Sequence, residues 1–192
     1  MSRVILPNML GSTMSSPQTP EITLDDVMAQ VGFILFRWSH FERVLNEQTD
    51  WLETRVDSTE GNKTKHHGAF QVFTRWKALN ELGMKRDERH KNAVEKLNAM
   101  FSEVLKVRNA LCHGQLSATG DPSKGKAFIE TELSGEKAIY HHSDLTATRG
   151  KIHYTQEILR DISSLASGLD ERTANTVYQN MRGRFKQVEN IQ

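Results

Sequence analysis

The sequence predicts an all-α protein, an antiparallel bundle of about four long helices with a small β-hairpin or meander inserted. Apolar residues recur at intervals of three and four along several long segments, which is the period of a helix face. Between about residues 114 and 154 this pattern gives way to an alternating, glycine-containing stretch. The 192 residues, 37% hydrophobic and 26% charged, suit one globular domain with a real core.

Three parts are expected along the chain. Residues 1–21 hold three of the four prolines, so they predict an N-terminal arm outside the core. Residues 22–182 then form the helical domain, with the β insertion at 114–154. Residues 183–192 are expected to be a C-terminal tail.

The first helix is expected to begin at Thr23, because Thr23-Leu24-Asp25-Asp26 resembles a capping box. It should run for about 35 residues, or about 50 Å. Phe33, Ile34 and Phe36 widen its apolar stripe, which indicates burial on two sides, by the core and by a second subunit. We therefore expect a homodimer. The stripe itself consists of Leu24, Val27, Val31, Leu35, Trp38, Phe41, Leu45, Leu52 and Val56.

The second and third helices are expected at about 69–82 and 87–113, after a loop at 57–68. Gly83 and Gly114 follow their last apolar residues, as the glycine after a helix end commonly does.

The strands are expected around 127–133 and 137–142, joined by Ser-Gly. A last long helix should begin at Tyr154, with Thr155 as its N-cap and an apolar stripe that reaches Met181.

Charge and cysteine content limit the partners. The 25 Lys and Arg against 24 Asp and Glu do not predict nucleic-acid or membrane binding except through a local patch. The only cysteine, Cys112, excludes an internal disulfide and multi-cysteine zinc patterns, and we expect it to pack in the fold of a cytoplasmic protein. The longest purely apolar run, 33–36, is far too short to span a membrane, and no secretory signal is evident.

No metal or other cofactor is expected. The adjacent histidines at 66–67 and 141–142 have no accompanying acid or cysteine cluster at ligand spacing, so metal binding is the less favoured interpretation. Glycine-rich phosphate loops, Gly-x-Ser-x-Gly and His-Glu-x-x-His are all missing from the sequence.

Arg108 is the unusual residue of the third helix. It falls on the same face as Val94, Leu97, Phe101 and Val104, where a guanidinium is costly unless it is paired or lines a site. Glu42 falls on the apolar stripe of the first helix in the same way, so a Glu42–Arg108 pair is one interpretation. The other is that both side chains lie at a stripe edge and reach water.

Asn109 and His113 share one helix face, and Arg108 lies beside it, so the three side chains can converge. The dipole at a helix C-terminus favours imidazolium, which suits His113 as a proton donor. Ordinary capping is the alternative, because basic residues before a glycine are common in a last helical turn.

The segment from Arg108 to Gly114 resembles the HEPN superfamily signature, in which four to six residues separate an Arg from a His and a polar residue often follows the Arg directly. The aromatic-x-x-x-Glu rhythm ending at Glu42 is similar to the first helix of several bacterial HEPN families. The resemblance implies a helical homodimer with both motifs in one cleft. It further implies a metal-independent endoribonuclease that uses the ribose 2′-OH and leaves a 2′,3′-cyclic phosphate.

By matching positions, the resemblance assigns His113 as acid and base, Arg108 as the phosphate clamp and Asn109 as the residue that orients the phosphate. Glu42 is expected to support the site through its pairing with Arg108. It also implies a toxin or defence effector, with RNA and a neutralising protein as partners. Gln115 departs from toxins that carry a modified Tyr at this position, which puts that control in doubt. The alternatives are an inactive HEPN-like module that binds a protein or nucleotide through the 114–154 hairpin, and a structural helical dimer.

Overall fold

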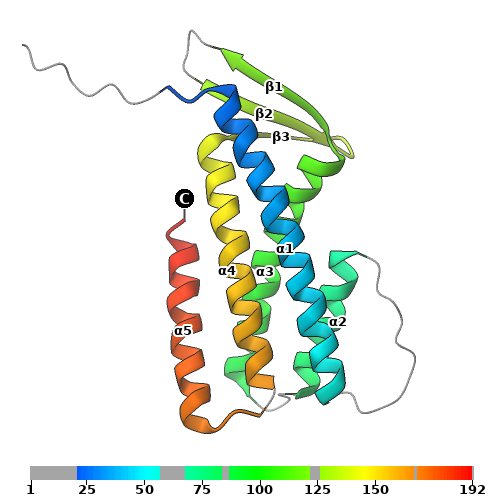
Figure 1. Cartoon of the computed structure of the whole chain (residues 1–192), viewed down its shortest axis with the longest axis vertical. Coiled ribbons are helices and arrows are strands. Elements are labelled where there is room, and N and C mark those ends of the chain that lie inside the picture. Colours follow the sequence, from blue (N-terminus) through cyan, green and yellow to red (C-terminus); the bar gives the residue numbers. More distant parts are fainter. Residues whose placement is uncertain (1–20, 57–67, 84–86, 122–125, 167, 192) are drawn as a thin grey trace, which may run out of the picture.

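A computed structural model describes residues 21–56, 68–83, 87–121, 126–166 and 168–191 (Figure 1). Within these ranges the chain forms five helices and a three-stranded sheet that lies at one end of the bundle. The expected all-α architecture with one β excursion is therefore confirmed at this level. Nearly all of the expected arm and the loop at 57–67 lie outside the described residues.

The helices are α1 (Leu24–Val56), α2 (Ala69–Gly83), α3 (Glu88–His113), α4 (His142–Ala166) and α5 (Glu171–Glu189). Strands β1 (Gln115–Asp121), β2 (Lys126–Leu133) and β3 (Glu136–His141) form one antiparallel sheet in the order β1-β2-β3. Helix α4 packs against α1, α3 and α5, so it is the central helix of the bundle.

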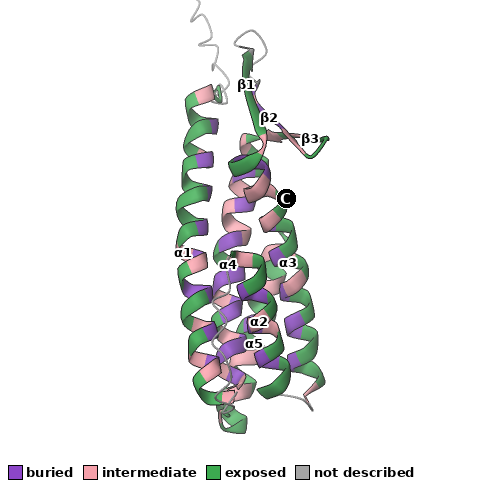
Figure 2. Ribbon diagram, turned by 90° about the vertical axis from the view of Figure 1, so that its right-hand side faces the viewer, coloured by how far each residue is buried: buried purple, intermediate pink, exposed green. Residues whose placement is uncertain are grey.

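The start of α1 confirms the predicted capping box. The Thr23 hydroxyl accepts a hydrogen bond from the Asp26 amide at 3.2 Å, and Asp26 Oδ2 accepts one from the Thr23 amide at 2.9 Å. The buried residues of α1 face the other helices, and the opposite side of this helix is exposed along most of its length (Figure 2).

Five aromatic side chains form the centre of the core. Phe101 of α3 stacks on Phe73 of α2, with ring centroids 4.0 Å apart and planes at 6°. It also packs against Trp38 and Phe41 of α1, at 6.0 and 5.9 Å. Trp76 completes the set, and its indole N–H donates to Ser163 of α4 at 2.8 Å. These contacts fix α3, and the motif at its C-terminal end, relative to α1.

The prediction for the last helix is wrong in two ways, its starting residue and its continuity. Helix α4 begins at His142, and Asp144 in its first turn accepts a hydrogen bond from the His141 amide at 2.8 Å. Thr155 is an interior position instead, and its buried hydroxyl donates to the Lys151 carbonyl at 2.7 Å. The helix then stops before Gly168, whose φ is 81°, and Asp170 caps a separate α5 that continues past residue 182 to Glu189.

The sheet covers the end of the bundle with one face. The predicted Ser-Gly turn is present, since Ser134 and Gly135 both have positive φ (53° and 83°), as tight hairpins require. The buried residues of β2 alternate along the strand and so share the face of the sheet that covers the bundle: Ala127, Ile129 and Thr131. Because α3 leads directly into β1, the Arg108–His113 segment lies where the bundle meets the sheet.

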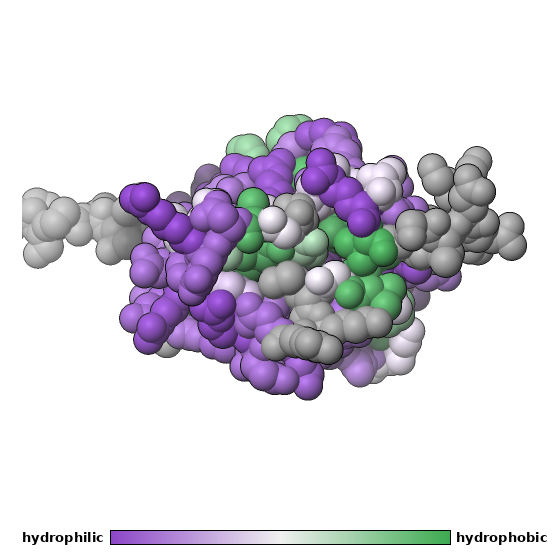
Figure 3. Space-filling view, turned by 90° about the horizontal axis from the view of Figure 1, so that it is seen from below, coloured by the Kyte–Doolittle hydropathy of each residue, from purple (hydrophilic) through white to green (hydrophobic). Residues whose placement is uncertain are grey.

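At the opposite end of the bundle, apolar residues gather in the middle of a hydrophilic rim (Figure 3). None of the helices in the described ranges combines the length and apolar character that crossing a membrane would need.

His90, near the start of α3, gives a prediction about acid stability. Its side chain is 1% exposed, and neither ring nitrogen has a hydrogen-bond partner among the described residues. Burial lowers the pKa of His90 from 6.5 to about 4. The folded state therefore binds fewer protons than the unfolded state between these values, and stability is lost as pH falls from about 6.5 toward 4. The loss should approach about 3 kcal/mol.

Urea unfolding at fixed protein concentration between pH 7 and 4.5 measures this loss. His90→Leu should flatten the pH dependence, whereas exposed His153→Gln should leave it as in the wild type. Equal slopes for the wild type and His90→Leu would contradict the assignment.

Candidate active site

Arg108, Asn109 and His113 come together at the last turns of α3. One amino group of Arg108, Nη1, donates to Asn109 Oδ1 at 3.1 Å and contacts His113 Nε2 at 3.0 Å. The predicted convergence of the three side chains is therefore present. The contact spans five residues of one helix, so the final turn itself holds the imidazole against the guanidinium.

The predicted pairing of Glu42 with Arg108 is also present. Arg108 Nη2 lies 3.8 Å from Glu42 Oε1, and the two side chains are 23% and 35% exposed. The sequence left two interpretations open, a charged pair among apolar residues and two side chains that reach water. The structure combines them, because the two groups are paired and both remain partly exposed. Such a geometry positions the guanidinium more than it stabilises the fold.

Trp38 fixes the carboxylate of this pair. Its indole N–H donates to Glu42 Oε1 at 2.7 Å, and its ring lies 5.7 Å from Arg108 Cζ. Since Trp38 also packs against Phe41 and Phe101, the site is connected to the aromatic core of the bundle. The sequence placed Trp38 only on the apolar stripe, and no sequence signal distinguished its role as a donor to Glu42.

Arg108 keeps unused hydrogen-bonding capacity. Its Nε is buried and has no partner in the described part of the chain, and its Nη2 makes only the longer contact to Glu42. Because Nε is buried, an anion reaches this guanidinium through Nη1 and Nη2, which can bind a phosphate through two parallel hydrogen bonds. This arrangement suits an anion that arrives from outside.

His113 is exposed, and its Nε2 lies 3.0 Å from Arg108 Nη1. A guanidinium only donates, so Nε2 is the acceptor when this contact is a hydrogen bond. An imidazole can accept a proton in one step and return it in the next.

Gly114 ends α3 by a different route from the left-handed stop that was predicted. Its φ is −75° and ψ is 160°, an extended conformation open to any residue, and its amide donates to the Ala110 carbonyl at 3.1 Å. The glycine is required by close approach, because a Cβ here would lie 2.5 Å from the Ala110 oxygen and 3.2 Å from the Glu132 oxygen. The backbone turn after His113 thus requires a residue without a Cβ atom at position 114.

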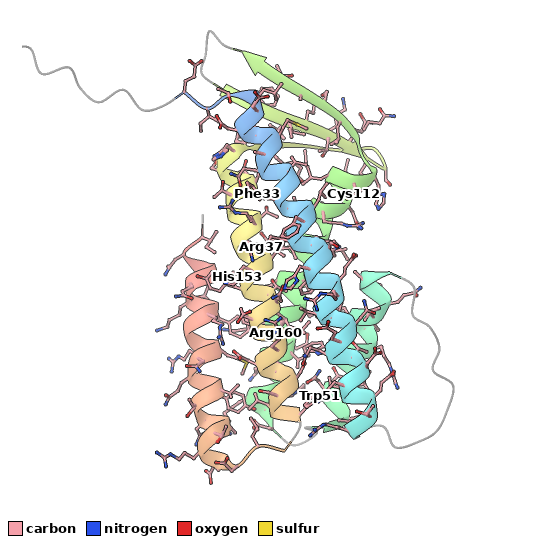
Figure 4. The ribbon with its side chains drawn as sticks, in the orientation of Figure 1. Phe33, Arg37, Trp51, Cys112, His153 and Arg160 are labelled. Atoms are coloured by element: carbon pink, nitrogen blue, oxygen red, sulfur yellow. The ribbon has the colours of Figure 1, made fainter. Side chains whose placement is uncertain are left out.

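Cys112 does not pack in the core as expected. It is exposed at the C-terminal end of α3, beside the sheet (Figure 4). Among the residues with described positions, no three His, Cys, Asp or Glu side chains gather as metal ligands would.

A cavity of about 430 Å³ opens directly beside the motif. It lies between α3, β2, β3 and the first turn of α2, and Asn109 is one of its walls. The cavity was not predicted from the sequence. The one pattern related to it is on α3, where polar residues at helical spacings share one face: Ser102, Lys106, Asn109 and His113.

Large apolar side chains remain exposed on α1. Phe36 is 72% exposed, and Met28, Phe33 and Leu35 are also uncovered. Phe33, labelled in Figure 4, lies beside α4, where Arg149 Cζ is 5.5 Å from its ring. Of the residues that widen the predicted apolar band, the chain's own fold buries Ile34 and leaves Phe33 and Phe36 exposed.

No family model, curated protein or solved structure matches this chain.

Proposed function

We propose that the chain is a metal-independent endoribonuclease that cleaves single-stranded RNA through the ribose 2′-OH and leaves a 2′,3′-cyclic phosphate. The observation that carries the proposal is the contact of Arg108 Nη1 with His113 Nε2, beside an Nη2 group that makes only a long contact, at 3.8 Å, to Glu42 among the described residues. It joins a proton acceptor to a phosphate binder. The HEPN-like motif supports the same chemistry.

The geometry supports the following roles. When Arg108 Nη1 turns from His113 to the phosphate, His113 Nε2 is free to accept the proton of the attacking 2′-OH, and the resulting imidazolium returns a proton to the leaving 5′ oxygen. Arg108 binds the non-bridging phosphate oxygens and offsets the charge that develops on them. Asn109 and Glu42 orient the guanidinium from two sides, and Trp38 holds Glu42.

The test is incubation of purified protein with a single-stranded RNA in excess EDTA. Cleavage should continue, and the products should carry 2′,3′-cyclic phosphate and 5′-hydroxyl ends. The same oligonucleotide with 2′-deoxyribose throughout should remain intact, because it lacks the nucleophile. Cleavage that stops in EDTA, or 5′-phosphate products, would sink the proposed mechanism in favour of a different reaction. If no RNA is cleaved, the alternative of a binding module replaces it.

We also propose that two copies pair through the exposed apolar face of α1, defined here by Met28, Leu35 and Phe36. This face leads toward the site, because Glu42 follows Leu35 by two helical turns on the same edge of α1. Pairing over this face would bring the two Arg108–His113 sites near one another, with RNA bound between them.

Phe36→Asp should weaken the dimer at least about tenfold, because it places a charge in an apolar interface; this corresponds to about 1.4 kcal/mol. Sedimentation at matched concentrations measures the shift, and RNA cleavage should fall with it. Leu82→Asp is the control, since Leu82 is 45% exposed on α2. A wild-type protein that is monomeric at tens of micromolar would disprove the pairing.

A further inference from the structure

The cavity beside the motif has a mixed lining. Lys106 and Asn109 come from α3, Thr131 and Tyr140 from the inner face of the sheet, and Phe70 from the first turn of α2. Its volume of about 430 Å³ lies within the range of sites for small organic ligands. Three separate parts of the fold thus enclose it.

The cavity continues the proposed active site. Asn109 Oδ1 accepts from Arg108 Nη1, and Asn109 is also one of the residues that line the cavity. His113 follows Asn109 by one helical turn on the same face of α3. A nucleotide whose phosphate contacts Arg108 therefore has the cavity within reach of its base.

Thr131 supplies an unsatisfied polar group. The residue is 1% exposed, and its Oγ1 has no hydrogen bond of normal geometry in the described structure. The Tyr140 hydroxyl lies close enough to interact with it weakly, and burial raises the pKa of Tyr140, so the phenol remains a donor. A buried hydroxyl without a partner is costly, and a ligand with polar edges would remove that cost.

Phe70 supplies a flat apolar surface at the rim. Its side chain is 64% exposed. At the same mouth, Lys106 pairs with Glu136 at 2.8 Å, and both side chains face solvent. Aromatic faces that stack on bases, combined with polar groups that meet base edges, are the usual means of reading unpaired nucleotides.

We propose that this cavity binds one nucleobase next to the scissile phosphate, by stacking on Phe70 and by hydrogen bonds to Thr131, Tyr140 and Asn109. The inference rests on the proposed function, since Arg108 holds the phosphate to which that base is attached. The cavity then determines which base is accepted at the cleaved step.

The first experiment measures binding without cleavage. The four nucleoside monophosphates, as 3′ and as 5′ phosphates, are titrated into the full chain, with ribose 5-phosphate as the base-free probe. At least one nucleotide should bind about tenfold more tightly than ribose 5-phosphate, and Phe70→Ala should remove that advantage. Leu82→Ala, which changes an exposed apolar residue elsewhere on α2, should keep it.

The second experiment measures base preference in RNA cleavage. Thr131→Val removes the hydroxyl at constant shape and should change the ratio of kcat/KM among substrates that differ at one base. Thr131→Ser should restore the wild-type ratio, which a merely structural role for Thr131 would not require.

The outcomes separate the two proposals. If RNA is cleaved but Phe70→Ala and Thr131→Val keep wild-type nucleotide affinity and base preference, the base site is refuted and the ribonuclease stands. If RNA is not cleaved but nucleotides bind in a Phe70-dependent way, the ribonuclease fails and the base site stands. Nucleotides that bind no better than ribose 5-phosphate would overturn the base site in either case.

Discussion

RNA cleavage by His113→Ala is expected to be about 10²–10⁴-fold slower than by the wild type, the usual effect of losing one positioned proton-transfer group. The exposed ring makes a side-chain contact with Arg108 alone among the described residues. Its removal should therefore leave the fold and the dimer unchanged, as circular dichroism and sedimentation would verify.

Arg108→Lys separates charge from shape at the same site. A lysine keeps the positive charge but cannot form two parallel hydrogen bonds to a phosphate, so cleavage should fall nearly as far as in His113→Ala. Cleavage by either variant at the wild-type rate would remove that residue from the mechanism.

Gly114→Ala is expected to impair cleavage by about 10²-fold, although Gly114 itself performs no chemistry. An added Cβ would meet the carbonyl oxygens of Ala110 and Glu132, and these belong to backbone that cannot rotate away. The end of α3 or the start of β1 must then move, and His113 moves with it. Displacing a catalytic group by about 1 Å can cost this much.

The same crowding should destabilise the protein by about 1–3 kcal/mol, measured by urea unfolding. Gly183→Ala is the matched control, because a Cβ at this position of α5 meets nothing within 4 Å. The control should be as stable as the wild type or slightly more so. An active and stable Gly114→Ala would show that the backbone turn tolerates a side chain.

Much of the fold was predictable because periodicity and caps are local. The α1 capping box, the Ser134-Gly135 hairpin and the Arg108–Glu42 pair all follow from spacing along one or two elements. The α4 start was missed because Thr155 resembles an N-cap, whereas the actual start is marked by the hydrogen bond from the His141 amide to Asp144. Buried Thr155 shows how tertiary packing overrides such a signal.

The cavity could not be predicted from the sequence, for a different reason. Its walls come from α2, α3 and the sheet, and no local pattern states that Phe70 and Thr131 lie near Asn109. The sequence does place polar residues along one face of α3, but this spacing alone does not predict a cavity: Ser102, Lys106, Asn109 and His113.

Helix α3 has an imidazole near each end, and this affects how any pH–rate profile must be interpreted. His113 is the proposed base near one end, and His90 is buried near the other end. Protonation of His90 destabilises the fold as the pH falls from about 6.5 toward 4, and the loss of folded protein lowers the measured rate without concerning the reaction. His90→Leu is therefore the background in which the acid limb of the profile reports the chemistry of the site.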